Sequence, residues 1–224
     1  MILRGVIFDL DGVIIDSHPI HRSAWRRFLA SVGKNVTEEQ LNFVLDGRKR
    51  EEILQHFLGE LSADELREYG RRKEELFREE AMDLQPTGGL NSFLEELRAA
   101  GLLLSVASSG SKSRVGYVLD RLHLTPLFQA VITGDDVLVG KPNPEIFQLA
   151  ASAMGCGPSE VVVIEDAVAG VVAAKAAGMK CLAMATNGRR AALLKAGADH
   201  VASNFHEVSV ATLAKLGNGH FPNC

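Results

Sequence analysis

The chain has 224 residues, of which 46% are hydrophobic, and its 24 Lys and Arg against 28 Asp and Glu leave a formal net charge of −4 at pH 7. This balance is typical of a globular protein of one or two domains, and it argues against nucleic-acid binding, which requires clustered Lys and Arg. No apolar run approaches the roughly 20 residues of a membrane span, and the first residues lack the basic region and cleavage site of a signal peptide.

The three cysteines, Cys156, Cys181 and Cys224, are odd in number and widely spaced. They match neither a disulfide framework nor the spacing of a zinc site. Unpaired thiols are typical of a reducing compartment, so we expect a cytoplasmic protein.

The first predicted element is a strand, Arg4–Asp9, and the segment after it differs in composition. Between Ser17 and Asp83, 26 of 67 residues are charged, against 26 of the other 157. Apolar residues recur in this segment at the three- and four-residue spacing of amphipathic helices. Ser62 followed by Glu65 is the signature of a capping box, which predicts a long helix running toward Asp83. The segment is therefore predicted to be all-helical.

From residue 85 onward, short aliphatic stretches alternate with amphipathic ones. The further strands are predicted at Leu102–Ala107, Ala130–Thr133, Val161–Glu165, Lys180–Met184 and His200–Ala202. Helices are predicted at Leu90–Ala100, Ser111–Leu122, Pro144–Met154, Ala169–Ala177, Arg190–Ala196 and Phe205–Leu216. Apolar strands that alternate with helices indicate a parallel sheet covered on both faces. We predict an α/β core with a Rossmann-like parallel sheet, residues 1–16 and 85–224, and an inserted all-α cap domain, residues 17–84.

Polar side chains follow four of the predicted strands. They are Asp9 and Asp11, Ser108 and Ser109, Lys141, and the pair Glu165 and Asp166. In an open parallel sheet, ligands bind at the carboxyl ends of the strands, so these groups are predicted to meet at one edge. Four carboxylates that meet repel one another unless a cation neutralises them, and Mg²⁺ prefers such oxygen ligands. With a lysine and hydroxyls beside the metal, the pattern indicates a phosphoryl-transfer site.

Each of these elements also has a structural interpretation when it is taken alone. An Asp-x-Asp sequence is common at surface turns, Ser-Ser-Gly can cap a helix, and Glu165-Asp166 can cap the helix that follows. Lys141 alone can be a solvated lysine. The joint placement of all four at successive strand ends favours the functional interpretation.

Four segments resemble the motifs of the haloacid dehalogenase superfamily, in its group with a helical cap after the first strand. They are Phe8–Ser17, Val106–Ser109, Gly140–Phe147 and Val163–Gly170, in the family's order. The resemblance implies that Asp9 is the nucleophile, which forms an aspartyl-phosphate, and that Asp11 is the general acid and base. A halide leaving group needs no proton, so Asp11 favours phosphoryl transfer over dehalogenation.

The same resemblance implies the remaining roles in the core. Ser108 and Ser109 would bind the phosphoryl group, and Lys141 would bridge it to Asp9. Mg²⁺ would be held by the carboxylates of Asp9 and Asp166 and by the main-chain carbonyl of Asp11. Glu165 would ligate the metal directly or through water.

The predicted cap resembles that of the β-phosphoglucomutase-like group. His21 and Trp25 have the spacing His-x-x-x-Trp, and Gly47 with Arg50 resembles the substrate loop of that cap. The resemblance implies that His21 contacts Asp11 and that Arg50 holds a phosphate or hydroxyl of the substrate. Trp25 also lies on an apolar helix stripe and can be a core residue, and Arg50 can belong to a solvated helix start.

One position departs from the mutase pattern, which has Ser where this chain has Gly110 and Lys-Asn where it has Ser111-Lys112. In the mutase these positions help to hold the second phosphate of a bisphosphate. We therefore favour a Mg²⁺-dependent phosphatase of a small phosphorylated metabolite, such as a sugar phosphate, with a phosphosugar mutase as the alternative. The expected partner is that metabolite, with no nucleic acid and no membrane, and the chain is expected to be a monomer or weak dimer.

Two other classes of protein share part of this pattern. A phosphorelay receiver domain also carries acids, Ser or Thr, and Lys on a parallel sheet, but its phosphorylated Asp ends an interior strand of the chain and it has no helical cap. A binding protein that has lost catalysis is the second, although every acid of the motifs is present.

Overall fold

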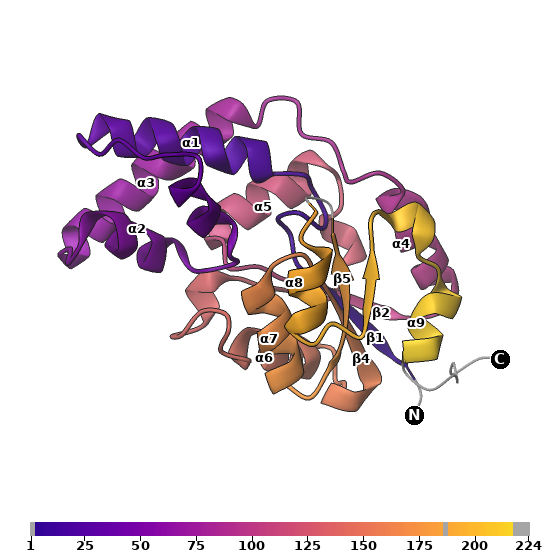
Figure 1. Ribbon diagram of the computed structural model, residues 1–224. Helices are drawn as coiled ribbons and strands as arrows, with labels where there is room; N and C mark the ends of the chain where they lie inside the picture. The colour runs from indigo at the N-terminus through magenta and orange to yellow at the C-terminus, as the bar shows by residue number, and fades with distance from the viewer. Residues whose placement is uncertain (1–2, 186–187, 217–224) are drawn as a thin grey trace.

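The computed structural model describes residues 3–185 and 188–216, in which six parallel strands form one sheet (Figure 1). The strands are β1 (Gly5–Phe8), β2 (Leu103–Ala107), β3 (Ala130–Ile132), β4 (Val161–Glu165), β5 (Lys180–Met184) and β6 (His200–Ala202). The order β3-β2-β1-β4-β5-β6 places β1 in the middle. Phe8 lies level with Val106 of β2 and Ile164 of β4. The residues that follow these three strands therefore meet at one edge of the sheet.

Helices cover both faces of the sheet. Two groups flank it in Figure 1, namely α4 (Leu90–Ala99), α5 (Lys112–Arg121) and α9 (Val210–Leu216) on one face, and α6 (Glu145–Ala153), α7 (Val168–Ala176) and α8 (Arg190–Lys195) on the other. Successive side chains of a strand point to opposite faces. Phe8 accordingly belongs to the same apolar cluster as Phe93 of α4, whereas Ile7 belongs with Phe147 of α6. Both faces of β1 are buried, as the apolar strand predicts.

The segment between β1 and α4 forms a separate helical layer at one end of the sheet (Figure 1). It comprises α1 (His18–Ser31), the 3₁₀ helix η1 (Gln40–Leu45), α2 (Arg50–Leu58) and α3 (Ala63–Glu80). It has its own apolar cluster, which includes Trp25, Phe28 and Ile53. The predicted capping box is confirmed, since the Ser62 hydroxyl accepts from the Glu65 N–H and the Glu65 carboxylate accepts from the Ser62 N–H. We call residues 18–80 the helical insertion.

The predicted fold class, a parallel α/β sheet with an all-α insertion, is confirmed. The single helix predicted over Phe205–Leu216 is wrong, because it is divided into a short 3₁₀ helix, η5 (Phe205–Glu207), and α9. The Asn204 side chain accepts from the His206 N–H, and Ser209 accepts from the Thr212 N–H to start α9. Other 3₁₀ turns connect the core elements at η2 (Thr125–Leu127), η3 (Gly134–Asp136) and η4 (Pro158–Glu160).

Cys156 and Cys181 are buried free thiols, and Cys224 lies outside the described residues. Within the described ranges, no helix combines the length and the apolar character that crossing a membrane would require.

Candidate active site

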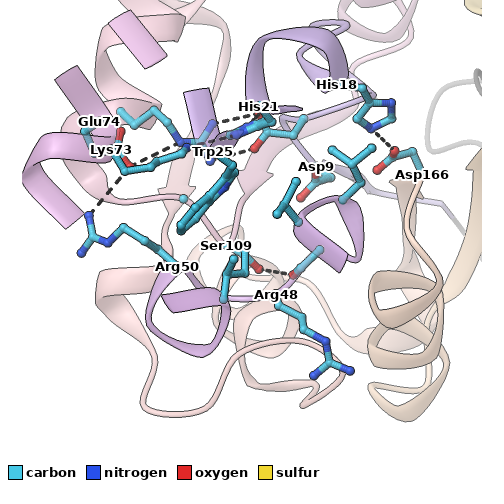
Figure 2. Close-up of a pocket in the computed structure, with 17 residues that line it drawn as sticks. Asp9, His18, His21, Trp25, Arg48, Arg50, Lys73, Glu74, Ser109 and Asp166 are labelled. Atoms are coloured by element: carbon cyan, nitrogen blue, oxygen red, sulfur yellow. Dashed lines mark hydrogen bonds and ion pairs between the residues drawn. The ribbon is translucent and has the colours of Figure 1, made fainter. Parts of the chain in front are cut away.

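Asp9 follows the central strand and lies at the base of a pocket between the sheet edge and the helical insertion (Figure 2). Its N–H donates to the Ile164 carbonyl at 2.9 Å, which continues the ladder, and its side chain is buried. The chain then turns at Gly12, whose φ is 75°. A β-carbon on Gly12 would overlap the Asp166 carboxylate, so both the left-handed backbone and the close approach require glycine.

Lys141 is fully buried and joins the acids of two strands. Its Nζ donates to Asp9 Oδ1 at 2.5 Å, to Glu165 Oε1 at 2.7 Å and to the Ala107 carbonyl at 3.1 Å. Burial alone would lower the pKa of Lys141, but the carboxylates of Asp9 and Glu165 raise it above its usual value. Lys141 is therefore a permanent cation beside Asp9, where a phosphoryl group would add negative charge.

Glu165 is predicted to ligate the metal directly or through water, and both of its carboxylate oxygens accept hydrogen bonds from the chain. One of its oxygens accepts from Lys141, and the other accepts from the N–H groups of Asp166 at 2.7 Å and Ala167 at 2.8 Å. Both oxygens are thus engaged in orienting Lys141 and in shaping the loop after β4. Over residues 3–185 and 188–216, no three side chains among His, Cys, Asp and Glu form a ready-made metal cage.

The carboxylates of Asp9 and Asp166, by contrast, fit a cation. Burial raises the pKa of Asp9 well above its usual value, and repulsion from neighbouring acids adds to this despite Lys141. Burial likewise raises the pKa of Asp166 to about 6, although its Oδ2 lies 2.8 Å from Nε2 of His18. Burial makes the charged form of both carboxylates costly, so a cation that neutralises them would be favourable. Carboxylate oxygens are also the ligands that Mg²⁺ prefers.

Asp11 is surrounded by donors. Its Oδ1 accepts from Ser17 Oγ at 2.7 Å, His21 Nε2 at 3.0 Å and Arg114 Nη1 at 2.9 Å, and its Oδ2 accepts from Arg114 Nη2 at 2.7 Å. Burial would raise the pKa of Asp11, but Arg114 and then His21 bring it well below its usual value. The predicted contact between His21 and Asp11 is present, and Asp11 is held as a carboxylate.

A buried lysine of α3 extends this network. Lys73 Nζ lies 3.1 Å from His21 Nδ1 and over the rings of Trp25 and Phe77. Burial lowers the pKa of Lys73 to about 8, and burial together with Lys73 lowers the pKa of His21 to about 3. His21 is therefore neutral, accepts from Lys73 at Nδ1 and donates from Nε2 to Asp11. A chain of hydrogen bonds thus runs from α3 through α1 to Asp11.

The predicted substrate loop meets the sheet edge directly. Ser109 Oγ donates to the Gly47 carbonyl at 2.6 Å, so its hydroxyl holds the insertion (Figure 2). Ser108 is buried beside it, and its Oγ accepts from the Gly110 N–H. Both serines therefore lie at this edge of the sheet, and their role as phosphate ligands stays a prediction.

Arg50 and Trp25 both line the pocket. Arg50 donates twice to Glu51 Oε1, at 3.2 and 2.6 Å, and it lies along Gly70 of α3, where a β-carbon would crowd its guanidinium. Trp25 is 1% exposed and belongs to the apolar cluster of the insertion. Trp25 is therefore both a core residue and part of the pocket wall. The apolar stripe of its helix predicted the first position, and the His-x-x-x-Trp spacing predicted the second.

The sequence patterns missed four polar pocket residues, namely His18, Lys73, Glu74 and Arg114. Lys73 and Glu74 stand inside a run of charged residues that looks solvated throughout. Arg114 had an indirect signal, because the departure at Gly110 is what makes room for it: a β-carbon on Gly110 would overlap the Arg114 guanidinium.

The family model for haloacid dehalogenase-like hydrolases matches residues 6–184. The chain belongs to this family. A phosphorylated carbohydrates phosphatase of Thermotoga maritima is 35% identical over 181 residues, which cover 80% of this chain and 83% of that protein. A β-phosphoglucomutase of Bacillus subtilis is 31% identical, with 79% and 81% covered. A β-phosphoglucomutase structure from Clostridium difficile superposes with a TM-score of 0.86 at 25% identity, covering 97% of this chain and 98% of that one.

The predicted resemblance to the haloacid dehalogenase family is thereby confirmed, and the chain is an enzyme of the phosphate-ester-hydrolysing part of that family. Its relatives include both sugar-phosphate phosphatases and β-phosphoglucomutases.

Proposed function

We propose that this protein is a Mg²⁺-dependent phosphatase of a sugar or polyol phosphate, and that it acts through a phosphorylated Asp9. The observation that carries the proposal is that Asp9 and Asp11 line one pocket while the buried Lys141 lies beneath it, with its Nζ 2.5 Å from Asp9 Oδ1. A buried carboxylate beside a permanent cation is suited to attack an anionic phosphoryl group, because the lysine reduces the repulsion between them.

In the first step, an oxygen of Asp9 attacks phosphorus, the bond from phosphorus to the ester oxygen breaks, and Asp11 gives its proton to the departing alcohol. Arg114, His21 and Ser17 hold Asp11 ionised in the structure. A phosphate dianion next to Asp11 opposes these donors and raises the pKa of Asp11 toward protonation. In the second step, a water attacks the phosphorus, the bond to Asp9 breaks, and Asp11 accepts the proton of that water.

Mg²⁺ would be held by the carboxylates of Asp9 and Asp166 with the main-chain carbonyl of Asp11, and it would supply charge neutralisation of the phosphoryl oxygens. Glu165 would position the other groups, because its oxygens accept hydrogen bonds from Lys141 and from the loop that carries Asp166. Ser108 would donate to the phosphoryl group.

We also infer that residues 17–84 act as a cap domain over a core of residues 1–16 and 85–224. Three contacts support this division: Ser109 with the Gly47 carbonyl, Lys49 Nζ with the Val137 carbonyl at 2.9 Å, and Arg189 with Asp46 at 2.8 Å. All three are polar, and polar contacts are exchanged readily with water when an interface opens. The buried free thiols support a reducing, cytoplasmic location.

The alternative, a phosphosugar mutase, is supported by the relatives of that activity. Against it, the Arg114 guanidinium lies against Gly110, the position where the mutase pattern carries a serine that helps to hold a second phosphate. The Arg114 guanidinium is already paired with Asp11 and is therefore not free to bind a second phosphate.

The test is hydrolysis of p-nitrophenyl phosphate and of a panel of sugar and polyol phosphates, with Mg²⁺ and with a chelator. The panel includes β-glucose 1-phosphate with a bisphosphate activator, and both free phosphate and the isomeric product are measured. We expect Mg²⁺-dependent phosphate release without isomer. Isomer formation faster than phosphate release would establish the mutase instead, and no turnover of any ester by folded protein would reject the enzyme assignment.

A further inference from the structure

Glu74 of α3 is an acid in the pocket to which the mechanism above assigns no role. It follows Lys73 in the chain, and its side chain is only 12% exposed. In Figure 2, Glu74 and Arg50 lie at the end of the pocket away from Asp9 and Asp166. A substrate whose phosphate reaches Asp9 would therefore extend its other end toward Glu74.

The carboxylate of Glu74 is not satisfied by its neighbours. Its Oε1 lies 3.7 Å from Arg50 Nη1 and 3.9 Å from Arg114 Nε, which are ion-pair distances beyond hydrogen-bond range. Its Oε2 is buried and has no hydrogen-bond partner among the residues that the structure describes. A buried carboxylate oxygen without a donor is costly, so it marks a position where a donor from outside the chain would bind.

The surrounding charges restrict what that donor can be. A second phosphate or a carboxylate on the substrate would face the negative charge of Glu74, and the nearby cations are engaged, Arg114 by Asp11, Arg50 by Glu51 and Lys73 by the His21 ring. An ammonium group would face Arg50, Arg114 and Lys73 together. A neutral hydroxyl donates a hydrogen bond without either repulsion.

The apolar part of the pocket wall agrees with this choice. Trp25, Val44 and Ile53 line the same pocket and provide apolar surface for the C–H faces of a carbon chain or a sugar ring. Hydroxyls on one side and C–H groups on the other are the chemistry of polyols and sugars.

We propose that Glu74 is a substrate-binding residue that accepts a hydrogen bond from a hydroxyl at the uncharged end of a sugar or polyol phosphate. The proposal rests on the phosphatase function proposed above and adds that the substrate carries a single anionic group. A charge-assisted hydrogen bond to a buried carboxylate oxygen discriminates strongly against analogues that lack the hydroxyl.

The test compares kcat/KM for hydroxylated and unhydroxylated esters, using glycerol 1-phosphate and sorbitol 6-phosphate against propyl phosphate and p-nitrophenyl phosphate. For the wild type we expect the hydroxylated esters to be preferred. Glu74→Gln keeps the shape but removes the charge, and we expect it to lower that preference by about 10- to 100-fold. Glu74→Met, which removes the acceptor, is the second variant and is expected to lower it further.

Glu75→Gln is the matched control, because Glu75 is the next residue on α3 and pairs with exposed Arg71 on the outer surface. It is expected to leave the preference unchanged. Equal loss of turnover on all four esters in the Glu74 variants would show that Glu74 only supports Arg50 and Arg114, and it would overturn the proposal. A wild type that prefers bisphosphates, or that hydrolyses propyl phosphate as well as glycerol 1-phosphate, would also overturn it. Failure to hydrolyse any ester would instead reject the phosphatase function itself.

Discussion

Gly110 lies directly against Arg114, so that a β-carbon at position 110 would occupy the space of the guanidinium. Arg114 is 4% exposed and donates to both oxygens of Asp11. The glycine and the arginine therefore act as one feature: the absence of a side chain on one residue permits the other to hold Asp11.

This relationship predicts a strong coupling between substitutions at the two positions. Gly110→Ser alone is expected to displace Arg114 and to lower kcat by about 10- to 100-fold, as much as Arg114→Ala does, because each removes the same bidentate contact. In the Arg114→Ala background, Gly110→Ser is expected to cost little more. The four kcat values form a double-mutant cycle, and additive effects would contradict the coupling.

Asp9→Asn is expected to lower turnover by more than about 1000-fold, because the amide is a poor nucleophile. The fold should remain intact, since the amide oxygen still accepts from Lys141 and one of several repelling carboxylates is removed. Phosphate release and circular dichroism measure the two properties. A variant that keeps a tenth of the wild-type rate would exclude Asp9 as the nucleophile.

The lowered pKa of the buried Lys73 leads us to expect a defined pH dependence of stability. Its pKa is about 8 in the folded chain and is ordinarily 10.5, so between these values the unfolded chain binds more protons. The contribution of Lys73 to the free energy of unfolding therefore increases as the pH rises, by about 2 kcal/mol between pH 7.5 and 9.5. Other titrating groups change the stability of the wild type and of the Lys73→Met variant alike. The quantity to measure is therefore the difference between their free energies of unfolding in urea, as a function of pH. No change in this difference with pH would show that Lys73 keeps its ordinary pKa.

The hydrogen-bond chain also predicts the tautomer of His21. With its pKa at about 3, His21 is neutral at pH 7 and carries its proton on Nε2, because Nδ1 accepts from Lys73. The ¹⁵N shifts of the His21 ring should show this tautomer in the wild type. A proton on Nδ1, or a charged ring at pH 7, would contradict the direction of the chain.

Arg50→Ala tests the substrate loop. Arg50 lines the pocket on the insertion, far from the atoms that react, so we expect kcat/KM for a sugar phosphate to fall about 10- to 100-fold and that for p-nitrophenyl phosphate to fall much less. Arg67→Ala, at an exposed position of α3, is the control. Equal losses on both substrates would assign Arg50 a structural role.

Much of the fold could be predicted from local patterns. The strands β4, β5 and β6 have the predicted bounds, because short apolar runs between helical stretches have few alternatives in a parallel sheet. The helix predicted from Phe205 failed because Ser209 caps a new helix start, a choice that depends on Phe205 being buried under α4. The candidate catalytic groups were also readable, because each follows a strand and parallel strands end at one edge.

The linear order of residues by itself determined the sheet, the inserted helices, and the meeting of Asp9, Asp11, Lys141 and Asp166, since each depends on periodicity or on position after a strand. Only the tertiary structure decided that Glu165 serves Lys141, that Ser109 holds the insertion, and that Lys73, Glu74 and Arg114 line the pocket. The physical reason is that charged residues on a helix look alike in sequence. Only the packing of the folded chain decides which of them lie in solvent and which are buried in the pocket.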